Sequence, residues 1–285
     1  MFDRSAPVIP IAADAKRTGN GFVQRCPAHE DRTPSLSQWV DGNGRWAIHC
    51  HAGCSFEDII AAAQIGDAFQ SRYYAPIIDK PVDTEYLADI WAETLPITSS
   101  DAAQAYMSRR GLLVGDYADI RAHRWLWFAD RTYSSAIVSK IRIDGVLSGI
   151  QRTFIKADGQ KKERRILGKV KNGCVHISNA NDRDLVISDG IENAIAHAQI
   201  NMALTTRSYR AALNANNPPR QILPKDPGKL TILPDIDGSG IGQRRANELA
   251  EKASRMGWRV FIDHPDQGSD WNDHLLAGRN GYGAC

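Results

Sequence analysis

The 285-residue sequence lacks any uninterrupted apolar run of the roughly 20 residues that a membrane-spanning helix needs. Residues 1–20 hold no apolar stretch followed by a small-residue cleavage site, so we expect no signal peptide. Charge of neither sign is in excess, since 35 Lys and Arg stand against 33 Asp and Glu, a net charge of +2. The overall charge therefore says little about partners, and its distribution along the chain says more.

Cysteine is scarce as well, and the five residues are unevenly placed. Three of them, Cys26, Cys50 and Cys54, fall in one short segment, whereas Cys174 and Cys285 have no neighbouring partner and are expected to be free thiols. An odd number with local crowding favours a metal site in a reducing compartment over disulfide bonds. We therefore expect a cytoplasmic protein.

A phosphate-binding loop of the form G-x-x-x-x-G-K-[ST] is also absent, so the sequence carries no recognisable helicase motor. It shows no internal repeat and no low-complexity tract. What is present is an apolar content of 42%, which supports a substantial core. This length accommodates two domains, or one domain with a small appendage.

Two pairs of metal-binding residues stand near the N-terminus. Cys26-Pro-Ala-His29 is followed by Cys50-His-Ala-Gly-Cys54. A C-x2-H pair and a C-x3-C pair separated by a hairpin are the usual presentation of four tetrahedral Zn²⁺ ligands. His49 and His51 flank Cys50 and are possible competitors, but we expect them to be neighbours of the site.

The segment around these pairs predicts a small unit that depends on its metal. Leu36 to Val40 and Arg45 to His49 are plausible strands, and Asp41-Gly-Asn-Gly44 between them is a strong turn signal. Ser55-Phe-Glu-Asp58 predicts a capping box that begins a helix extending to Ala63. So small a unit buries little apolar surface and would need the ion for stability.

The middle of the chain predicts a linker, two helices and a hairpin. Pro76 to Pro81 is the linker, and the helices cover Thr84 to Glu93 and Ser100 to Arg110, with Ser100 as N-cap and Gly111 as the stop. A second hairpin is expected from Ala136 to Ile155, because Asp144-Gly145 is a two-residue turn.

The segment 152–171 is strongly basic. We expect its cations to bind a phosphate backbone without reading sequence, the alternative being a solvated loop. They are Arg152, Lys156, Lys161, Lys162, Arg164, Arg165, Lys169 and Lys171. Just upstream, Trp125, Trp127 and Phe128 could stack on bases, but we expect them in the core.

From Asp184 onward the sequence alternates between strand and helix patterns. We expect strand 184–188, helix 190–200, a short strand near 202–205, a helix near 208–214, strand 229–233, helix 240–256, strand 258–262 and a helix from about 271. Such alternation is typical of parallel strands joined by right-handed crossovers, so we predict a small α/β domain.

Two strands of this predicted sheet end in acidic residues, Asp189 after the first, and Asp235 and Asp237 after the second. In an open parallel sheet such groups point into the ligand crevice. Three carboxylates gathered there repel one another unless a divalent cation lies between them, and hard oxygen ligands suit Mg²⁺. We therefore predict phosphoryl-transfer chemistry with these three residues as catalytic and metal-binding groups; helix caps or Asp-based turns are the alternative.

The N-terminal motifs resemble a known family. Cys26-Pro-Ala-His-Glu-Asp-Arg-Thr-Pro-Ser-Leu-Ser37, followed by His49-Cys-His-Ala-Gly-Cys-Ser55, resembles the zinc-binding domain of bacterial-type DNA primases, and is closest to the phage, plasmid and mobile-element branch. The resemblance implies a structural Zn²⁺ and places Arg32 among the residues presented to template DNA.

The acidic motifs resemble the Toprim domain that topoisomerases share with these primases. Asp189-Gly-Ile-Glu-Asn-Ala-Ile-Ala196 matches its first motif, except that the family normally has Glu where this chain has the shorter Asp189. Glu192, one helical turn on, would partly compensate. Asp235-Ile-Asp237 matches the second motif without change.

The segment Ser269-Asp-Trp-Asn-Asp273 resembles a third acidic element, which is common in mobile-element relatives. It makes Asp270 a further candidate magnesium ligand, together with Asp273. Capping of the helix that begins at Trp271 is the alternative for Asp270.

With this resemblance the expected architecture is α/β, or α+β overall. A small zinc-ribbon-like domain precedes a primase catalytic core that ends in a Toprim domain with a parallel sheet flanked by helices. We divide the chain into a zinc-binding domain over 1–70, a linker with the start of a helical segment over 71–98, a basic N-terminal lobe of the core over 99–180, and the Toprim domain over 181–285.

The function implied is that of a DNA primase, a nucleotidyltransferase that makes short RNA primers on single-stranded DNA from nucleoside triphosphates. It would use structural Zn²⁺ and catalytic Mg²⁺ or Mn²⁺, and would serve replication of a phage, plasmid or other mobile element. The missing motor predicts a separate replicative helicase as partner, and no membrane is expected. Two alternatives stay open: a Toprim-type metal-dependent nuclease, and a nucleic-acid-binding accessory protein with a weakened active site.

Overall fold

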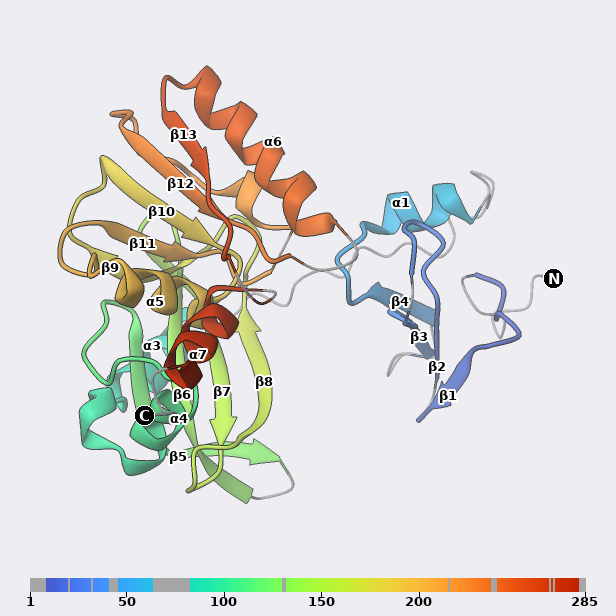
Figure 1. Ribbon diagram of the computed structural model, residues 1–285. Coiled ribbons are helices and arrows are strands. Elements are labelled where there is room, and N and C mark those ends of the chain that lie inside the picture. The colour runs from blue at the N-terminus through green and yellow to red at the C-terminus, as the bar shows by residue number, and fades with distance from the viewer. Residues whose placement is uncertain are drawn as a thin grey trace. The chain divides into compact units, whose positions relative to one another are not determined.

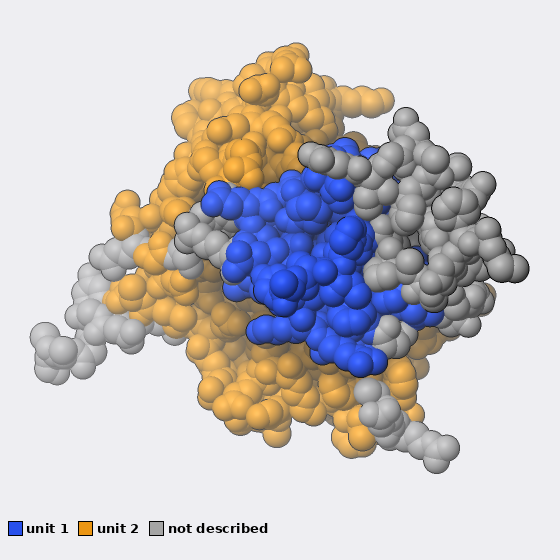
Figure 2. Space-filling model, turned by 90° about the vertical axis from the view of Figure 1, so that its right-hand side faces the viewer, with its two compact units in different colours: residues 1–80 blue, residues 81–285 orange. Residues whose placement is uncertain are grey.

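The computed structural model describes residues 9–19, 21–31, 33–40, 46–63, 83–129, 132–214, 216–236, 240–266, 268 and 270–281. They belong to two compact units, residues 1–80 and 81–285, which Figure 2 colours separately. The predicted linker at 76–81 lies outside the described residues. In the part of the chain that is described, no helix is long and apolar enough to cross a membrane.

The first unit is a four-stranded antiparallel sheet followed by one helix. The strands pair in chain order: β1 (Lys16–Thr18), β2 (Gly21–Gln24), β3 (Leu36–Val40) and β4 (Trp46–Cys50). The predicted hairpin is confirmed as β3 and β4, with its turn outside the described residues. Helix α1 (Phe56–Ala62) begins with the predicted capping box, in which Ser55 and Asp58 bond each other's backbone N–H.

The second unit opens with two helices that the sequence predicted. Helix α3 (Thr84–Ala92) is capped by Asp83, and after a 3₁₀ turn (Ile97–Ser99) helix α4 (Asp101–Arg109) is capped by Ser100. Gly111 has a φ of +69°, the left-handed conformation that ends many helices and that glycine adopts without strain.

These helices cover the two faces of an antiparallel sheet. Its strands are β5 (Ile120–Ala129), β6 (Thr132–Ile143), β7 (Val146–Ile155) and β8 (Lys161–Gly168), paired in chain order. The β6–β7 turn has Asp144 at φ +49° and Gly145 at φ +79°, so the predicted two-residue hairpin is confirmed. Leu87 and Ile90 of α3 pack against Phe154 on one face, and α4 packs on the other.

The last part is a five-stranded mixed sheet in the order β13-β12-β10-β11-β9. Its strands are β9 (Val175–Asn179), β10 (Asp184–Ser188), β11 (Ser208–Ala211), β12 (Lys229–Leu233) and β13 (Arg259–Ile262). The four strands from β10 to β13 are mutually parallel and β9 is antiparallel to β11. The predicted parallel sheet is therefore confirmed, with an antiparallel edge strand that the sequence analysis missed.

Helices cover both faces of this sheet, as Figure 1 shows: α6 (Ile241–Arg255) lies on one side, and α5 (Ile191–Ile200) and α7 (Trp271–Gly281) lie on the other. A short 3₁₀ turn (Pro218–Arg220) packs beside α6. Strand β10 is buried on both faces, because Leu185 and Ile187 pack under α6 while Val186 packs with α5. This explains why the strand reads as a continuous apolar run.

Two predicted elements were wrong. Residues 202–205, expected as a strand, form the turn after α5, where the Ala203 N–H bonds the Ala198 carbonyl. Residues 208–211, expected in a helix, form β11. The alanines after Arg210 imitate a helical run, but pairing with β10 and β9 and complete burial of Tyr209 outweigh that local preference.

A buried ion pair joins the two sheets of the second unit. Asp119, 0% exposed, accepts hydrogen bonds from Nη2 and Nε of Arg142 on β6 at 2.6 and 2.7 Å. The same carboxylate accepts one from the backbone N–H of His176 on β9 at 3.4 Å. The Asp119 carboxylate therefore links β6 of the antiparallel sheet with β9 of the mixed sheet.

Replacement of Arg142 by methionine should destabilise the second unit by about 3 kcal/mol, because it leaves the Asp119 carboxylate buried without its cation. Urea denaturation followed by circular dichroism measures this. Arg255→Met is the matched control, since Arg255 pairs with Glu251 on an exposed face of α6, and it should cost less than about 1 kcal/mol. Equal costs for the two variants would contradict the assignment.

Candidate metal sites and catalytic carboxylates

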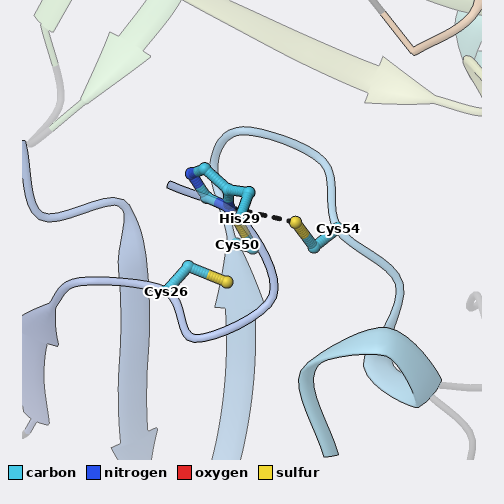
Figure 3. Close-up of side chains that lie close together, drawn as sticks. All are labelled: Cys26, His29, Cys50 and Cys54. Carbon is cyan, nitrogen blue, oxygen red and sulfur yellow. Dashed lines mark hydrogen bonds between the residues drawn. The ribbon is translucent and has the colours of Figure 1, made fainter. Parts of the chain in front are cut away.

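The four predicted zinc ligands lie together in the first unit. Cys26 and His29 come from the loop after β2, Cys50 ends β4, and Cys54 precedes α1. Their ligand atoms all lie within 4.8 Å of one another, and Figure 3 shows the side chains directed toward a common point. Zn–S bonds of about 2.3 Å place tetrahedral ligand atoms about 3.8 Å apart, so the group fits a zinc ion.

The imidazole of His29 is oriented for this role. Its Nδ1 lies 3.1 Å from Sγ of Cys54 and 4.0 Å from Sγ of Cys50, while its Nε2 lies 3.6 Å from Oδ1 of Asp31. Metal-binding histidines commonly present their second nitrogen to a carboxylate, which fixes the ring. Nδ1 is therefore the metal-facing atom.

Asp31 organises the loop that carries these ligands. Its Oδ2 accepts hydrogen bonds from the backbone N–H of Cys26 at 2.9 Å and of Ser35 at 3.1 Å, and from the Ser35 hydroxyl at 2.7 Å. Burial alone would raise the pKa of Asp31, but the hydrogen bonds from Ser35 and Cys26 outweigh it and lower the pKa. Asp31 is thus an ionised partner behind the ligands, which the sequence analysis did not single out.

The thiols differ in acidity. Burial raises the pKa of Cys26, and burial together with the charge of Cys50 raises the pKa of Cys54 to about 11. For Cys50, burial is outweighed by hydrogen bonds from Cys54 N–H, Ser35 and Ala52 N–H, which lower its pKa. Without a cation the three sulfurs cannot all carry charge, so a bound Zn²⁺ would displace protons and hold the loops together.

The two flanking histidines lie outside the cluster, as expected. Nε2 of His51 is 2.8 Å from the Ser37 hydroxyl, and the ring of His49 packs edge-on against that of His51 at 4.9 Å between centroids. They are neighbours of the site and are not among its four ligands.

In the second unit, two of the predicted acidic residues lie at the same edge of the sheet. Strands β10 and β12 are adjacent and parallel, with Ser188 opposite Leu233, so Asp189 and Asp235 leave the sheet at the same edge. Asp189 is 6% exposed, and its Oδ2 accepts a hydrogen bond from the backbone N–H of Asp235 at 3.4 Å. Gly190 is the N-cap residue of α5, so the alternative of Asp189 as that cap does not hold.

Close packing of α6 against this edge depends on Gly242. A β-carbon at that position would lie 2.7 Å from the carbonyl oxygen of Asp235 and 3.5 Å from Oδ2 of Asp189. A side chain there would therefore push the acidic loop away from the helix.

Asn193 orients the second carboxylate. Its Nδ2 donates to Oδ1 of Asp235 at 2.8 Å, and its Oδ1 accepts from the backbone N–H of Trp271 at 2.6 Å. Asn193 is buried in the first turns of α5, so it ties that helix to the loop after β12 and to the start of α7. The sequence places Asn193 in the first acidic motif but gives it no role, because an isolated asparagine in a helix carries no pattern.

Glu192 was expected to compensate for the short Asp189, but its carboxylate has other partners. Oε1 accepts a hydrogen bond from the hydroxyl of Tyr106 on α4 and pairs with Arg164 of β8 at 3.0 Å. Burial would raise the pKa of Glu192, but the charge of Arg164 and the Tyr106 hydrogen bond outweigh it and lower the pKa. Glu192 thus connects α5 with α4 and with strand β8 of the antiparallel sheet.

Two of the remaining predicted site residues, Asp237 and Arg32, lie outside the described residues. Asp270 precedes α7, and its Oδ1 accepts from the Asp273 backbone N–H at 2.8 Å, which is the capping contact that the sequence left open as its alternative.

The basic residues of 152–171 are divided between two faces of the antiparallel sheet. Arg164 lies on the face of α4 and α5, where it pairs with Glu192. Lys162 lies at a register shift of β8 against β7, donates to the Ser134 hydroxyl and is 5.7 Å from the Phe128 ring centroid. Arg165 lies on the face of α3 beside Arg152, its register partner, with its guanidinium 4.5 Å from the Phe128 ring centroid. The exposed lysines of the set are Lys156, Lys161, Lys162, Lys169 and Lys171.

The expectation that the aromatic run 125–128 lies in the core was wrong for both tryptophans. Trp125 is 68% exposed and Trp127 is 51% exposed, whereas Phe128 packs edge-on against Phe154. The register of β5 against β6 shifts between His123 and Leu126 and again after Trp127. These irregularities break the inward–outward alternation that a sequence pattern assumes.

Replacement of Asp31 by alanine should weaken zinc binding by about 10- to 100-fold, because the ligand loop loses the acceptor that orients His29 and Cys26. Competition with a chromogenic zinc chelator measures the affinity. Asp14→Ala is the control, since Asp14 forms an exposed ion pair with Arg25. An unchanged zinc affinity in Asp31→Ala would contradict the role given to this carboxylate.

The unfolding free energy of the second unit should fall as the pH drops below about 4.5, in part through Glu192. Its folded-state pKa is lowered, so its stabilisation is present above the unfolded pKa and is lost as protonation occurs through the folded pKa. Glu192→Gln should cost about 1.5–3 kcal/mol at pH 7 and flatten this pH dependence in denaturant titrations. Glu251→Gln, at an exposed position, should leave the profile as it is; an unchanged profile in Glu192→Gln would contradict the ion pair.

Residues 184–280 match the Toprim domain model, and residues 82–177 match a domain of unknown function, DUF7146. No curated protein matches the chain.

Similar solved structures include two primase fragments. One is the primase fragment of the bacteriophage T7 primase–helicase protein, with a TM-score of 0.42, 10% identity, and 97% of this chain and 96% of that chain covered. The other comprises the zinc-binding and RNA polymerase domains of the Aquifex aeolicus primase, with a TM-score of 0.43, 15% identity, and 94% and 79% covered. Both likenesses are remote, so the assignment rests on the sequence match and on the paired acidic strand ends: residues 184–280 are a Toprim domain.

Proposed function

We propose that this protein is a DNA primase, which synthesises short RNA primers on single-stranded DNA by metal-dependent nucleotidyl transfer. The observation that carries the proposal is the meeting of Asp189 and Asp235 at the carboxyl ends of adjacent parallel strands in a Toprim domain. The same chain holds a Cys3His cluster in a separate N-terminal unit. A nuclease of the Toprim type would use the carboxylates but has no evident need for the cluster.

The residues at the strand ends fit a hard divalent cation. Carboxylate oxygens are the ligands that Mg²⁺ and Mn²⁺ prefer, and the two side chains come from elements that packing holds in place. Asp189, Asp235 and, from the motif, Asp237 would hold one or two such ions, with Asp270 as a further candidate. When bound, the ions would neutralise charge on the α-phosphate of the incoming nucleotide and assist ionisation of the attacking 3′-hydroxyl.

The protein's own groups prepare this site. Asn193 holds the Asp235 carboxylate in one orientation, which lowers the reorganisation needed when a ligand arrives. Asp189 is buried beside it, so it either shares the ion or accepts the proton of the 3′-hydroxyl. Asp189 is shorter than the glutamate that the Toprim family normally has at this position. The proposed catalysis would therefore use a shorter carboxylate here.

The partners follow from the reaction. The template is single-stranded DNA and the substrates are nucleoside triphosphates, with a separate replicative helicase supplying the unwound strand. The basic residues of 152–171, together with Arg32, would contact the phosphate backbone. The zinc motif's resemblance to the mobile-element branch supports a role in replication of a phage, plasmid or other mobile element.

The test is primer synthesis by the purified protein with single-stranded DNA, labelled ribonucleotides and Mg²⁺ or Mn²⁺. Asp235→Ala should reduce synthesis at least about 100-fold, because it removes a carboxylate that acts on charge developing in the transition state, while binding of single-stranded DNA is retained. Asp226→Ala is the matched control, since this exposed aspartate lies just before the amino end of β12 and should leave the rate unchanged.

Other outcomes point elsewhere. Metal-dependent cleavage of the DNA without synthesis, abolished by Asp235→Ala, would replace the primase proposal with a nuclease. Binding of DNA without either activity would replace it with an accessory role.

A further inference from the structure

A hollow of about 500 Å³ lies on the antiparallel sheet of the second unit, beside the start of α4. Strands β5, β6, β7 and β8 contribute to its lining, which is completed by the turn after β7. The side chains that matter are Arg124, Trp125, Tyr133, Lys156 and Lys162, with Asp101 at the rim contributed by α4. Asp189 and Asp235 are not among the residues that line it.

An exposed aromatic pair forms one wall of it. The rings of Trp125 and Tyr133 are stacked, 5.8 Å apart between centroids and within 4° of parallel. Trp125 is 68% exposed and Tyr133 47% exposed, although large aromatic side chains are usually well buried. The pair therefore offers a flat apolar face to a ligand.

The strand is built to present this face. The β5–β6 register shifts between His123 and Leu126, so Trp125 lies in a bulge. The backbone N–H of Trp125 donates to Nδ1 of His123 at 3.2 Å, and Nε2 of that buried ring contacts Glu93 at 3.2 Å. Bulges commonly redirect a side chain beside a functional site, and here the redirected group is held by hydrogen bonds.

Three cations surround the aromatic pair and are bound to neutral groups. Arg124 donates to the Ser99 carbonyl, Lys156 to Oε1 of Gln160 and Lys162 to the Ser134 hydroxyl, at 2.9, 2.8 and 2.9 Å. Among the described residues none of the three forms an ion pair. With Asp101 as the one carboxylate among the described residues of the lining, these cations make the hollow positive, so that it suits an anion.

The turn that carries Lys156 is fixed on α4. Gly159 in this turn has a φ of +79°, and a β-carbon there would lie 2.4 Å from the backbone of Ala105 and Tyr106. Close contact with α4 therefore fixes the position of the turn that carries Lys156.

Strand β8 extends from the hollow toward the acidic site. Lys162 lines the hollow at a register shift of β8 against β7, and Arg164 follows it two residues further along the strand. Arg164 pairs with Glu192, which stands in the first turn of α5, three residues after Asp189. A nucleic-acid strand that extends from the hollow past Arg164 would therefore run from the aromatic pair toward the acidic site.

We propose that this hollow binds one unpaired nucleotide of single-stranded DNA. The base stacks on the Trp125–Tyr133 pair, and its phosphates contact Arg124, Lys156 and Lys162. Single-stranded nucleic acid is recognised by this combination of an aromatic platform and a cationic groove, and stacking excludes a base that is still paired. The identity of the strand as the primer template rests on the proposed function; the binding itself does not.

The experiment measures fluorescence anisotropy of a labelled single-stranded oligothymidylate titrated with the full chain. Trp125→Ala should weaken binding by about 5- to 150-fold, the range for loss of one stacked base. Trp125→Phe should keep most of the wild-type affinity. Lys162→Gln should lower the slope of log affinity against log salt by about one. Trp127→Ala is the matched control, because this tryptophan is exposed on the same strand outside the lining, and it should bind as wild type does.

An abasic oligonucleotide separates stacking from charge. The penalty of Trp125→Ala should vanish on this probe, while the effect of Lys162→Gln persists. Equal losses in Trp125→Ala and Trp127→Ala, wild-type affinity in Trp125→Ala, or a penalty that survives on the abasic probe would each overturn the proposal. Circular dichroism of each variant identifies any that fails to fold, and Tyr133→Leu then provides the second test of the platform.

The two proposals fail separately. If Trp125→Ala binds DNA as wild type does while Asp235→Ala has lost primer synthesis, the hollow is not the site and the primase assignment stands. If the Trp125 effect is present but wild type makes no primers, the nucleotide site stands and the primase assignment falls.

Discussion

The parallel pairing of β10 with β12 is the constraint on which the second unit's chemistry depends. Adjacent parallel strands end at one edge of the sheet, so the residues that follow them, Asp189 and Asp235, meet there although they are distant in the chain. Both strands are buried on both faces under helices. A slip by one residue would exchange the side chains that face α5 with those that face α6 and would shift Asp189 relative to Asp235 along the sheet edge.

Polar side chains then complete what the sheet begins. Asn193 binds Asp235 and the first residue of α7, and Glu192 binds Tyr106 and Arg164 from the neighbouring sheet. Buried polar groups need partners, so these contacts hold the helices in one arrangement and connect the acidic edge with the basic face of β8. The acidic edge and the antiparallel sheet are therefore parts of one packed unit.

The N-terminal unit is stabilised in a different way. Its apolar core is small, with Leu36, Ile59 and Ile60 packed against two of the cysteines. The loops that carry the ligands are organised around Asp31, which accepts hydrogen bonds from Cys26 and Ser35. A bound ion would supply the cross-link that so small a core lacks.

Local chemistry determined much of this protein from sequence alone: the ligand pairs of the zinc cluster, the capping box at Ser55, the Asp144-Gly145 turn and the apolar strands that end in aspartate each follow from neighbouring residues. Tertiary structure decided what depends on distant partners. Strand β11 forms against its helix-like alanines because β9 and β10 pair with it, Trp125 is exposed because β5 bulges, and Asn193 matters because two remote backbone segments pass beside it. Such contacts close only when the chain is packed, so no local pattern records them.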